Sequence, residues 1–138
     1  MEINILLRDL PVLFAAMFTA ILFAQSGFDK VFDRQGNLEW LQGHFSKTFL
    51  AGLVPLLLFQ ITVLEILTSM LAAGGVVYYL ITGGLEVIFW AAVLGAATIT
   101  ALFFGQRIAK DYAGAAVLVP YFLVMLVMMY LSVPGRLR

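Results

Sequence analysis

Four long apolar stretches alternate with short polar segments along the chain. A helix that crosses a bilayer needs about 20 mostly apolar residues. The first and last stretches have this length, and the last one stops at Pro134 and Gly135. The stretch from residue 48 to residue 104 holds only two charged residues, Glu65 and Glu86, and is long enough for two helices. We therefore predict membrane-spanning helices at about residues 10–28, 49–73, 84–104 and 115–133.

Two glycine pairs compete for the turn between the second and third helices. Gly74-Gly75 and Gly83-Gly84 both relax a helical pattern. We favour the second pair as the turn. The third helix then begins near Gly84, and Glu86 falls in its first turn. There the positive end of the helix dipole and water stabilise the carboxylate.

A polar segment separates the first two predicted spans. Within it, Leu38, Leu41 and Phe45 fall on one helical face, and Trp40 lies beside them. Tryptophan is enriched where membrane meets water, and a short amphipathic helix lies flat in that zone. We predict a short interfacial helix within residues 38–47.

Composition agrees with this pattern and narrows the class of protein. Apolar residues make up 63% of the chain and charged residues 12%, with a mean hydropathy of +1.03. Soluble domains are about 45–50% apolar and about 25% charged, so a soluble globular domain is excluded. We predict one all-α domain over residues 1–138, an integral membrane four-helix up-down bundle. The first helix is expected to be retained rather than cleaved, because Glu2 and Asp9 precede it.

The charge balance and the residues that are missing exclude several functions. Eight Lys and Arg balance eight Asp and Glu, so nucleic-acid binding lacks its main driving force. The chain has no Cys and one His, which excludes disulfides, cysteine-ligated iron–sulfur clusters and a bis-His haem held by this chain. We predict no metal and no covalently bound cofactor. A quinone or a lipid is the expected ligand class, and membrane lipids and other membrane subunits are the expected partners.

Glu65 is the most informative residue of the second span. A carboxylate near the centre of a spanning helix costs about 2.5–3.5 kcal/mol on insertion scales. Thr62, Glu65, Thr68, Ser69 and Ala72 fall on one helical face, which should turn into the bundle. Two interpretations stay open. Glu65 exchanges a proton or binds a polar head group such as a quinone carbonyl, or it is a protonated carboxyl that ties two helices together.

A second set of polar residues flanks the membrane on the face that carries both loops. Lys30 and Arg107, with Glu65, are candidates for contact with a quinone or lipid head group. Arg107 is also a candidate partner for Asp29 or Asp33 across the loops. The set either forms a docking surface or is an ordinary solvated rim. The candidate rim and partner contacts are Asp29, Asp33, Arg34, His44, Lys110 and Asp111.

Three segments of the chain resemble a known family. The first span ends in Gly27-Phe28-Asp29-Lys30, the second carries Glu65 followed by small residues and Gly74-Gly75, and a third segment covers residues 104–115. Together they resemble the DoxX-like family of small bacterial four-helix membrane proteins, in its Bacteroidetes type. Gly27, Lys30 and Glu65 match positions of that family. The resemblance implies the bacterial inner (cytoplasmic) membrane and a link to membrane oxidoreductase assemblies, including thiosulfate–quinone oxidoreductase.

These observations lead to a ranked set of functional hypotheses. The first is a non-catalytic accessory subunit of a larger membrane complex, respiratory or otherwise electron-transferring. The second is a subunit of a quinone-linked membrane oxidoreductase in which Glu65 exchanges protons. The third is a small transporter or channel. Membrane orientation and oligomeric state stay open at this point.

Overall fold

A computed structural model describes residues 2–136, and the regular structure in this range is entirely helical. Met1, Leu137 and Arg138, which belong to the predicted domain, lie outside the described residues. The elements in chain order are α1 (Ile3–Phe32), α2 (Arg34–His44), a 3₁₀ turn η1 (Ala51–Leu53), α3 (Val54–Thr82), α4 (Glu86–Ile108) and α5 (Tyr112–Ser132).

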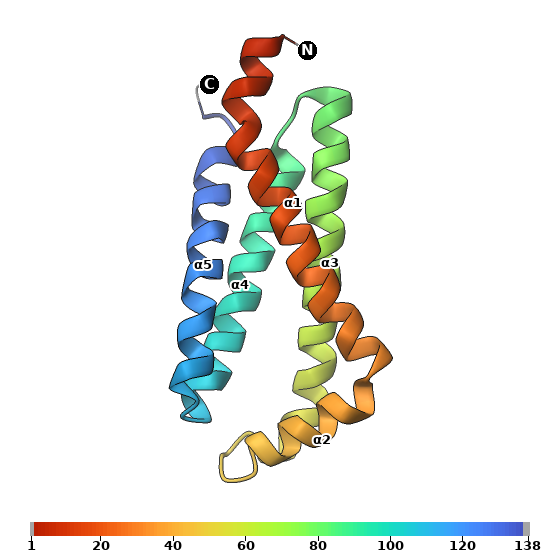
Figure 1. The fold of residues 1–138 in the computed structure, drawn as a ribbon, viewed down its shortest axis with the longest axis vertical. Coiled ribbons are helices and arrows are strands. Elements are labelled where there is room, and N and C mark those ends of the chain that lie inside the picture. Colours follow the sequence, from red (N-terminus) through yellow and green to blue (C-terminus); the bar gives the residue numbers. More distant parts are fainter. Residues whose placement is uncertain (1, 137–138) are drawn as a thin grey trace.

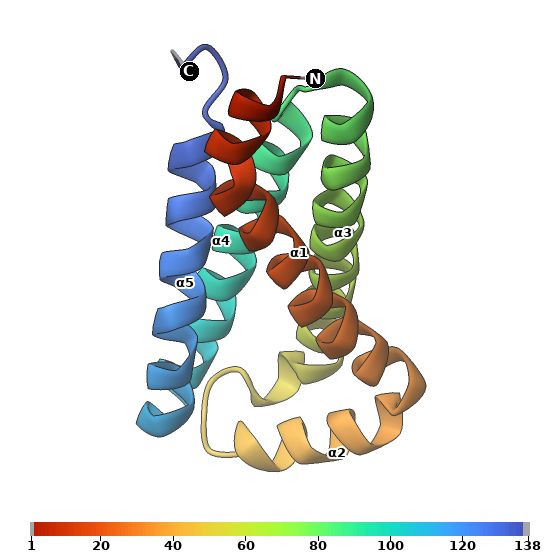
Figure 2. The same cartoon turned by 45° about the horizontal axis from the view of Figure 1, so that its top comes forward.

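The four long helices stand side by side, and α2 lies across one end of them (Figure 1). Both ends of the chain lie at the opposite end of the bundle (Figures 1 and 2). The helices α1, α3, α4 and α5 are each long and apolar enough to cross a membrane. The predicted all-α four-helix bundle with one short extra helix is therefore confirmed, and the chain is a multi-pass membrane protein.

Several helices begin or end at other residues than the approximate predicted spans do. Helix α1 extends past residues 10–28 at both ends, and α3 continues beyond residue 73 to Thr82. The two extensions of α1 hold charged residues, which an apolar window leaves out although the helical backbone hydrogen bonds continue there. Residues 74–82 of α3 are uncharged, and the helix continues through them because Gly74 and Gly75 do not interrupt it. At its start α3 begins at Val54 rather than residue 49, because a 3₁₀ turn precedes it and Pro55 occupies its first turn.

Smaller differences affect the other elements. The short helix α2 covers residues 34–44 rather than 38–47. Helix α4 starts two residues later and ends four residues later than predicted. Helix α5 starts at Tyr112 rather than at residue 115. Differences of this size are ordinary at helix ends, where turns fray.

The turn between α3 and α4 is at the second glycine pair, as predicted. Gly83 has φ of +75° and closes α3 by donating its N–H to the carbonyl of Tyr79. This left-handed conformation is routine for glycine and strained for other residues. Glu86 is the first residue of α4, so the expectation for its first-turn position is also confirmed.

Close approach of α3 to α4 depends on Gly75, which lies inside α3. A Cβ placed on Gly75 would lie 3.0 Å from the backbone nitrogen of Ile88 in α4 and 2.7 Å from its Cγ1. The neighbouring Gly74 faces open space, with nothing within 4 Å of such an atom. Small residues allow membrane helices to pack closely without help from the hydrophobic effect. Gly75 therefore sets the spacing of these two helices.

We expect Gly75→Ala to destabilise the bundle and Gly74→Ala to leave it unchanged or more stable. The added methyl at residue 75 meets α4 backbone, and overpacking of this kind costs about 1–3 kcal/mol. At residue 74 the methyl meets nothing, and alanine is a better helix former than glycine by about 1 kcal/mol. Unfolding of both variants in mixed detergent micelles measures the difference. Equal stabilities would show that the contact with Ile88 does not limit the packing.

Candidate functional site

A buried ion pair joins α1 to α3 near the end that carries α2. The Nζ of Lys30 lies 3.0 Å from Oε2 of Glu65, and the two side chains are 16% and 2% exposed. The Ser26 hydroxyl donates to Glu65 Oε1 at 3.0 Å, and Lys30 Nζ donates to Ser26 Oγ at 2.8 Å. We call these three residues the Lys30–Glu65–Ser26 cluster. Glu65 Oε1 accepts hydrogen bonds from Ser26 and Lys30, whereas Oε2, which is buried and accepts no hydrogen bond, is balanced by the nearby charge of Lys30.

The local sequence explains why these side chains meet. Ser26 and Lys30 are four residues apart on α1, so they project from the same face one turn apart. Between them, Gly27 packs against α3. A Cβ at Gly27 would lie 2.8 Å from Ile66 Cγ1 and 3.5 Å from Glu65 Cβ. The absence of a side chain at Gly27 lets α1 approach α3 closely enough for the ion pair to form.

The polar face predicted on the second span does turn into the bundle. Thr62, Glu65, Thr68, Ser69 and Ala72 are all buried. The three hydroxyls on this face donate to carbonyls of α3 itself, three or four residues earlier. They therefore need no partner on another helix, whereas the Glu65 carboxylate reaches across to α1.

A cavity of about 260 Å³ lies between α3 and α4, beneath α2. The two helices part toward this end of the bundle (Figures 1 and 2). The walls of the cavity are largely aliphatic and aromatic. Trp40 and Leu41 of α2, with Phe45 directly after this helix, close the cavity on one side. Lys30 is the charged residue among those that line it, and Gln60 and Gln106 supply amides. The cluster and the cavity are therefore contiguous through Lys30.

Helix α2 is fastened at its far end by His44. The ring Nε2 lies 2.9 Å from Gln106 Oε1 and 3.8 Å from Asp111 Oδ2. Trp40 stacks on the His44 ring with 4.5 Å between the ring centroids. No residue of α2 is fully buried, so these contacts, with the apolar residues over the cavity, hold α2 against the bundle.

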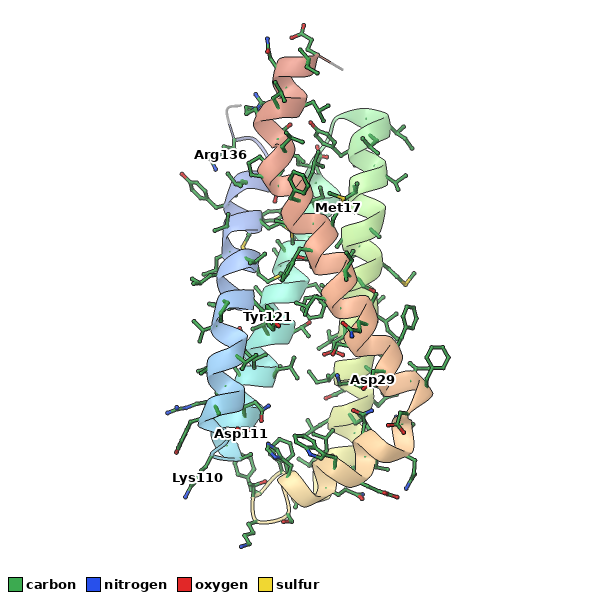
Figure 3. The ribbon with its side chains drawn as sticks, viewed as in Figure 1. Met17, Asp29, Lys110, Asp111, Tyr121 and Arg136 are labelled. Atoms are coloured by element: carbon green, nitrogen blue, oxygen red, sulfur yellow. The ribbon has the colours of Figure 1, made fainter. Side chains whose placement is uncertain are left out.

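The remaining rim residues lie at the same end but do not form one cluster. The Asn37 amide donates to Asp29 Oδ2 at 3.4 Å, and Asp111 caps α5 by accepting from the N–H of Gly114 at 2.9 Å. Figure 3 shows Asp29 on one side of this end and Asp111 with Lys110 on the other. Asp33 lies between α1 and α2, followed by the exposed Arg34 at the start of α2, and Lys110 is exposed with φ of +60°.

The expected pairing of Arg107 across the loops is not observed. Its guanidinium lies over the ring of Tyr112, 4.5 Å from the centroid. Among residues 2–136 no ion pair joins Arg107 to Asp29 or Asp33. The reason is topological, since α4 and the end of α1 stand on opposite sides of this end of the bundle (Figure 1). The structure thus brings Lys30 and Glu65 together and leaves Arg107 apart from them.

A second buried polar contact, at the opposite end, was missed from the sequence. Tyr79 of α3 donates its hydroxyl to Asp9 Oδ2 of α1 at 2.9 Å, and Asp9 is 4% exposed. Arg8 pairs with the other oxygen at 3.2 Å. The sequence contains a pattern that indicates this contact, because the buried helical face with Glu65, Ala72 and Gly75 continues with the same spacing to residue 79. The prediction that the helix ends at residue 73 concealed it.

The part of the chain that the structure describes contains no group of three or more His, Asp or Glu side chains placed to hold a metal ion. Comparison with protein-family models, curated proteins and solved structures finds no match for this chain. The resemblance to the DoxX-like family therefore stays a prediction.

We expect the Lys30–Glu65 pair to show strong coupling in a double-mutant cycle. Lys30→Met leaves the carboxylate buried without its counter-charge, and breaking a buried pair in this way costs about 3–5 kcal/mol. Lys30→Met combined with Glu65→Gln removes both charges and should lose far less than the sum of the single losses. The measurement is the free energy of unfolding of the two single variants and the double variant in mixed micelles. Additive losses would contradict a direct interaction.

Proposed function

We propose that the protein binds an amphipathic molecule taken up from the bilayer, with the polar head at Lys30 and the apolar body in the cavity beneath α2. The observation that supports this is the contact between an apolar cavity and a single ion-paired lysine. Ligand sites are mostly apolar, with a few polar groups that fix the orientation of the ligand. A lysine held in place by Glu65 and Ser26 is a fixed donor of that kind.

Quinone-linked chemistry is a second candidate, and the position of Lys30 favours it. A quinone head accepts hydrogen bonds at its carbonyl oxygens, and Lys30 is a donor that lines the cavity. Lys30 also contacts Glu65, so a proton can pass between a bound head and the carboxylate through Lys30. In this candidate the quinone supplies the redox chemistry, while Lys30 orients the head and Glu65 exchanges the proton.

The cellular setting of the proposal follows from the family resemblance. We place the chain in the bacterial inner membrane, as an accessory subunit that contributes this site to a larger electron-transfer complex. The hypothesis of a small transporter or channel stays a prediction from the sequence.

We expect Ala101→Phe to exclude the ligand by filling the cavity that Ala101 lines. The matched control is Ala97→Phe, one turn earlier on α4, where the side chain is exposed and lies outside the cavity. Each protein is extracted from native membranes into polymer-bounded lipid discs, and co-purified quinones and lipids are quantified by mass spectrometry. The quantity of one co-purified species should be at least about tenfold lower in Ala101→Phe, which is equivalent to about 1.4 kcal/mol of binding free energy. An identical set of bound molecules in both variants would contradict a ligand in this cavity.

The quinone candidate makes a separate prediction for Glu65→Gln. This change keeps the size of the side chain but removes the carboxylate that accepts and releases a proton. Quinone-dependent electron transfer in native membranes should fall by at least about tenfold, within the range of general acid–base contributions. The quinone content and the quantity of inserted protein are measured in the same preparation. Unchanged electron transfer would remove Glu65 from the proton path.

A further inference from the structure

We infer that the occupant of the cavity has an uncharged head that accepts hydrogen bonds and a single apolar chain, and that Gln60 and Gln106 select that head. This inference rests on the proposed binding of an amphipathic molecule at the cavity beneath α2 and specifies the chemistry of that molecule. Three properties of the site support it: its net charge, its hydrogen-bonding groups and its size.

Lys30 and Glu65 neutralise each other before any ligand binds. Lys30 is the charged residue among those that line the cavity, and the Glu65 carboxylate lies 3.0 Å from its Nζ. Asp29, next to Lys30 in sequence, adds a further negative charge nearby. A phosphate or carboxylate head would have to compete with Glu65 for Lys30, and a cationic head would meet the ammonium. An uncharged head avoids both penalties, since a buried charge must be paired.

The other polar groups of the cavity wall are poorly satisfied by the protein. The Gln60 side chain is exposed on the outer surface of α3, and it forms no hydrogen bond with another residue of the range 2–136. Gln106 accepts at its Oε1 from His44, and its NH₂ group donates to no described residue. Neither amide is fully buried, so both NH₂ groups are accessible to a ligand in the cavity. Together with the Lys30 ammonium, these NH₂ groups offer donors, so the complementary ligand carries acceptor oxygens.

The size of the cavity limits the ligand to a small cross-section. Its volume of about 260 Å³ lies just below the range of about 300–1,000 Å³ that is usual for drug-sized ligands. One ring or one chain fits such a space, whereas the two chains of a phospholipid do not. Gln60, Ala101 and Phe104 of the cavity wall are exposed on the outer surface of α3 and α4. The remainder of a long chain can therefore leave between these helices into the lipid.

The test uses two single-chain probes and the full chain in discs of uncharged phosphatidylcholine. One probe is a benzoquinone with a ten-carbon chain, and the other is an anionic lysophosphatidylglycerol. Calorimetric titration should show the quinone binding at least about tenfold tighter than the anionic probe. Gln60→Leu should weaken quinone binding about fivefold to tenfold, as expected for one lost hydrogen bond. The matched control Gln25→Leu, an exposed glutamine of α1 outside the cavity, should bind as the unmodified protein does.

Variants of Lys30 and Glu65 test directly how the charges of this pair select the ligand. Glu65→Gln removes the counter-charge of Lys30 and should raise affinity for the anionic probe about tenfold. Lys30→Gln combined with Glu65→Gln restores neutrality and should abolish that gain, and each variant is checked for folding by its helical content. A preference of the unmodified protein for the anionic probe, or equal quinone binding by Gln60→Leu, would overturn the inference.

The two levels of the proposal fail in different ways. The proposed function stands when a probe binds the unmodified protein and its binding is blocked by Ala101→Phe but not by Ala97→Phe. This holds even when selectivity for the uncharged head is absent. If neither probe binds the unmodified protein and the native preparations of Ala101→Phe and Ala97→Phe carry the same molecules, the proposed function itself is wrong, and the inference falls with it.

Discussion

The Lys30–Glu65 ion pair fixes how α1 lies against α3, because neither charge can stay alone inside an apolar bundle. In lipid there is little hydrophobic force between helices, so polar contacts and close packing must determine their arrangement. Gly27 makes the approach possible and Ser26 completes the coordination of the carboxylate. The position of the cavity follows from this pairing, since Lys30 is at once a partner of Glu65 and part of the cavity wall.

Two polar contacts hold the same pair of helices at opposite ends. Asp9 and Tyr79 join α1 to α3 near the chain termini, and Lys30 and Glu65 join them near α2. The core between these contacts is built from aliphatic, aromatic and methionine side chains. Gly75 brings α3 close to α4 at the end near their turn, and the two helices part at the other end (Figure 1). The open end is the one that α2 covers, which places the cavity at this end of the bundle.

This arrangement connects the fold to the proposed function. The cavity is lined by the polar residues Lys30 and Gln106 and by residues exposed on the outer surface of α3 and α4, so a polar head and an apolar chain can both be accommodated. Helix α2 contributes Trp40 to the wall, and His44 ties it to α4 and to the turn before α5. Among the rim residues at this end, Asp111 caps α5 and His44 fastens α2, while Lys30 and Glu65 carry the chemistry that we propose.

The sequence alone determined the class of the protein, because apolar stretches long enough to cross a bilayer can be read from composition and length. It also determined which face of α3 is buried, since the 3.6-residue period places Thr62, Glu65 and Ala72 in line. It did not determine which residue pairs with Glu65, because Lys30 is 35 positions away and its place depends on how α1 crosses α3. The Asp9–Tyr79 contact, the cavity and the separation of Arg107 from Asp29 are likewise consequences of helix packing. Local periodicity carries no information on the distance between helices, so only the tertiary structure decided them.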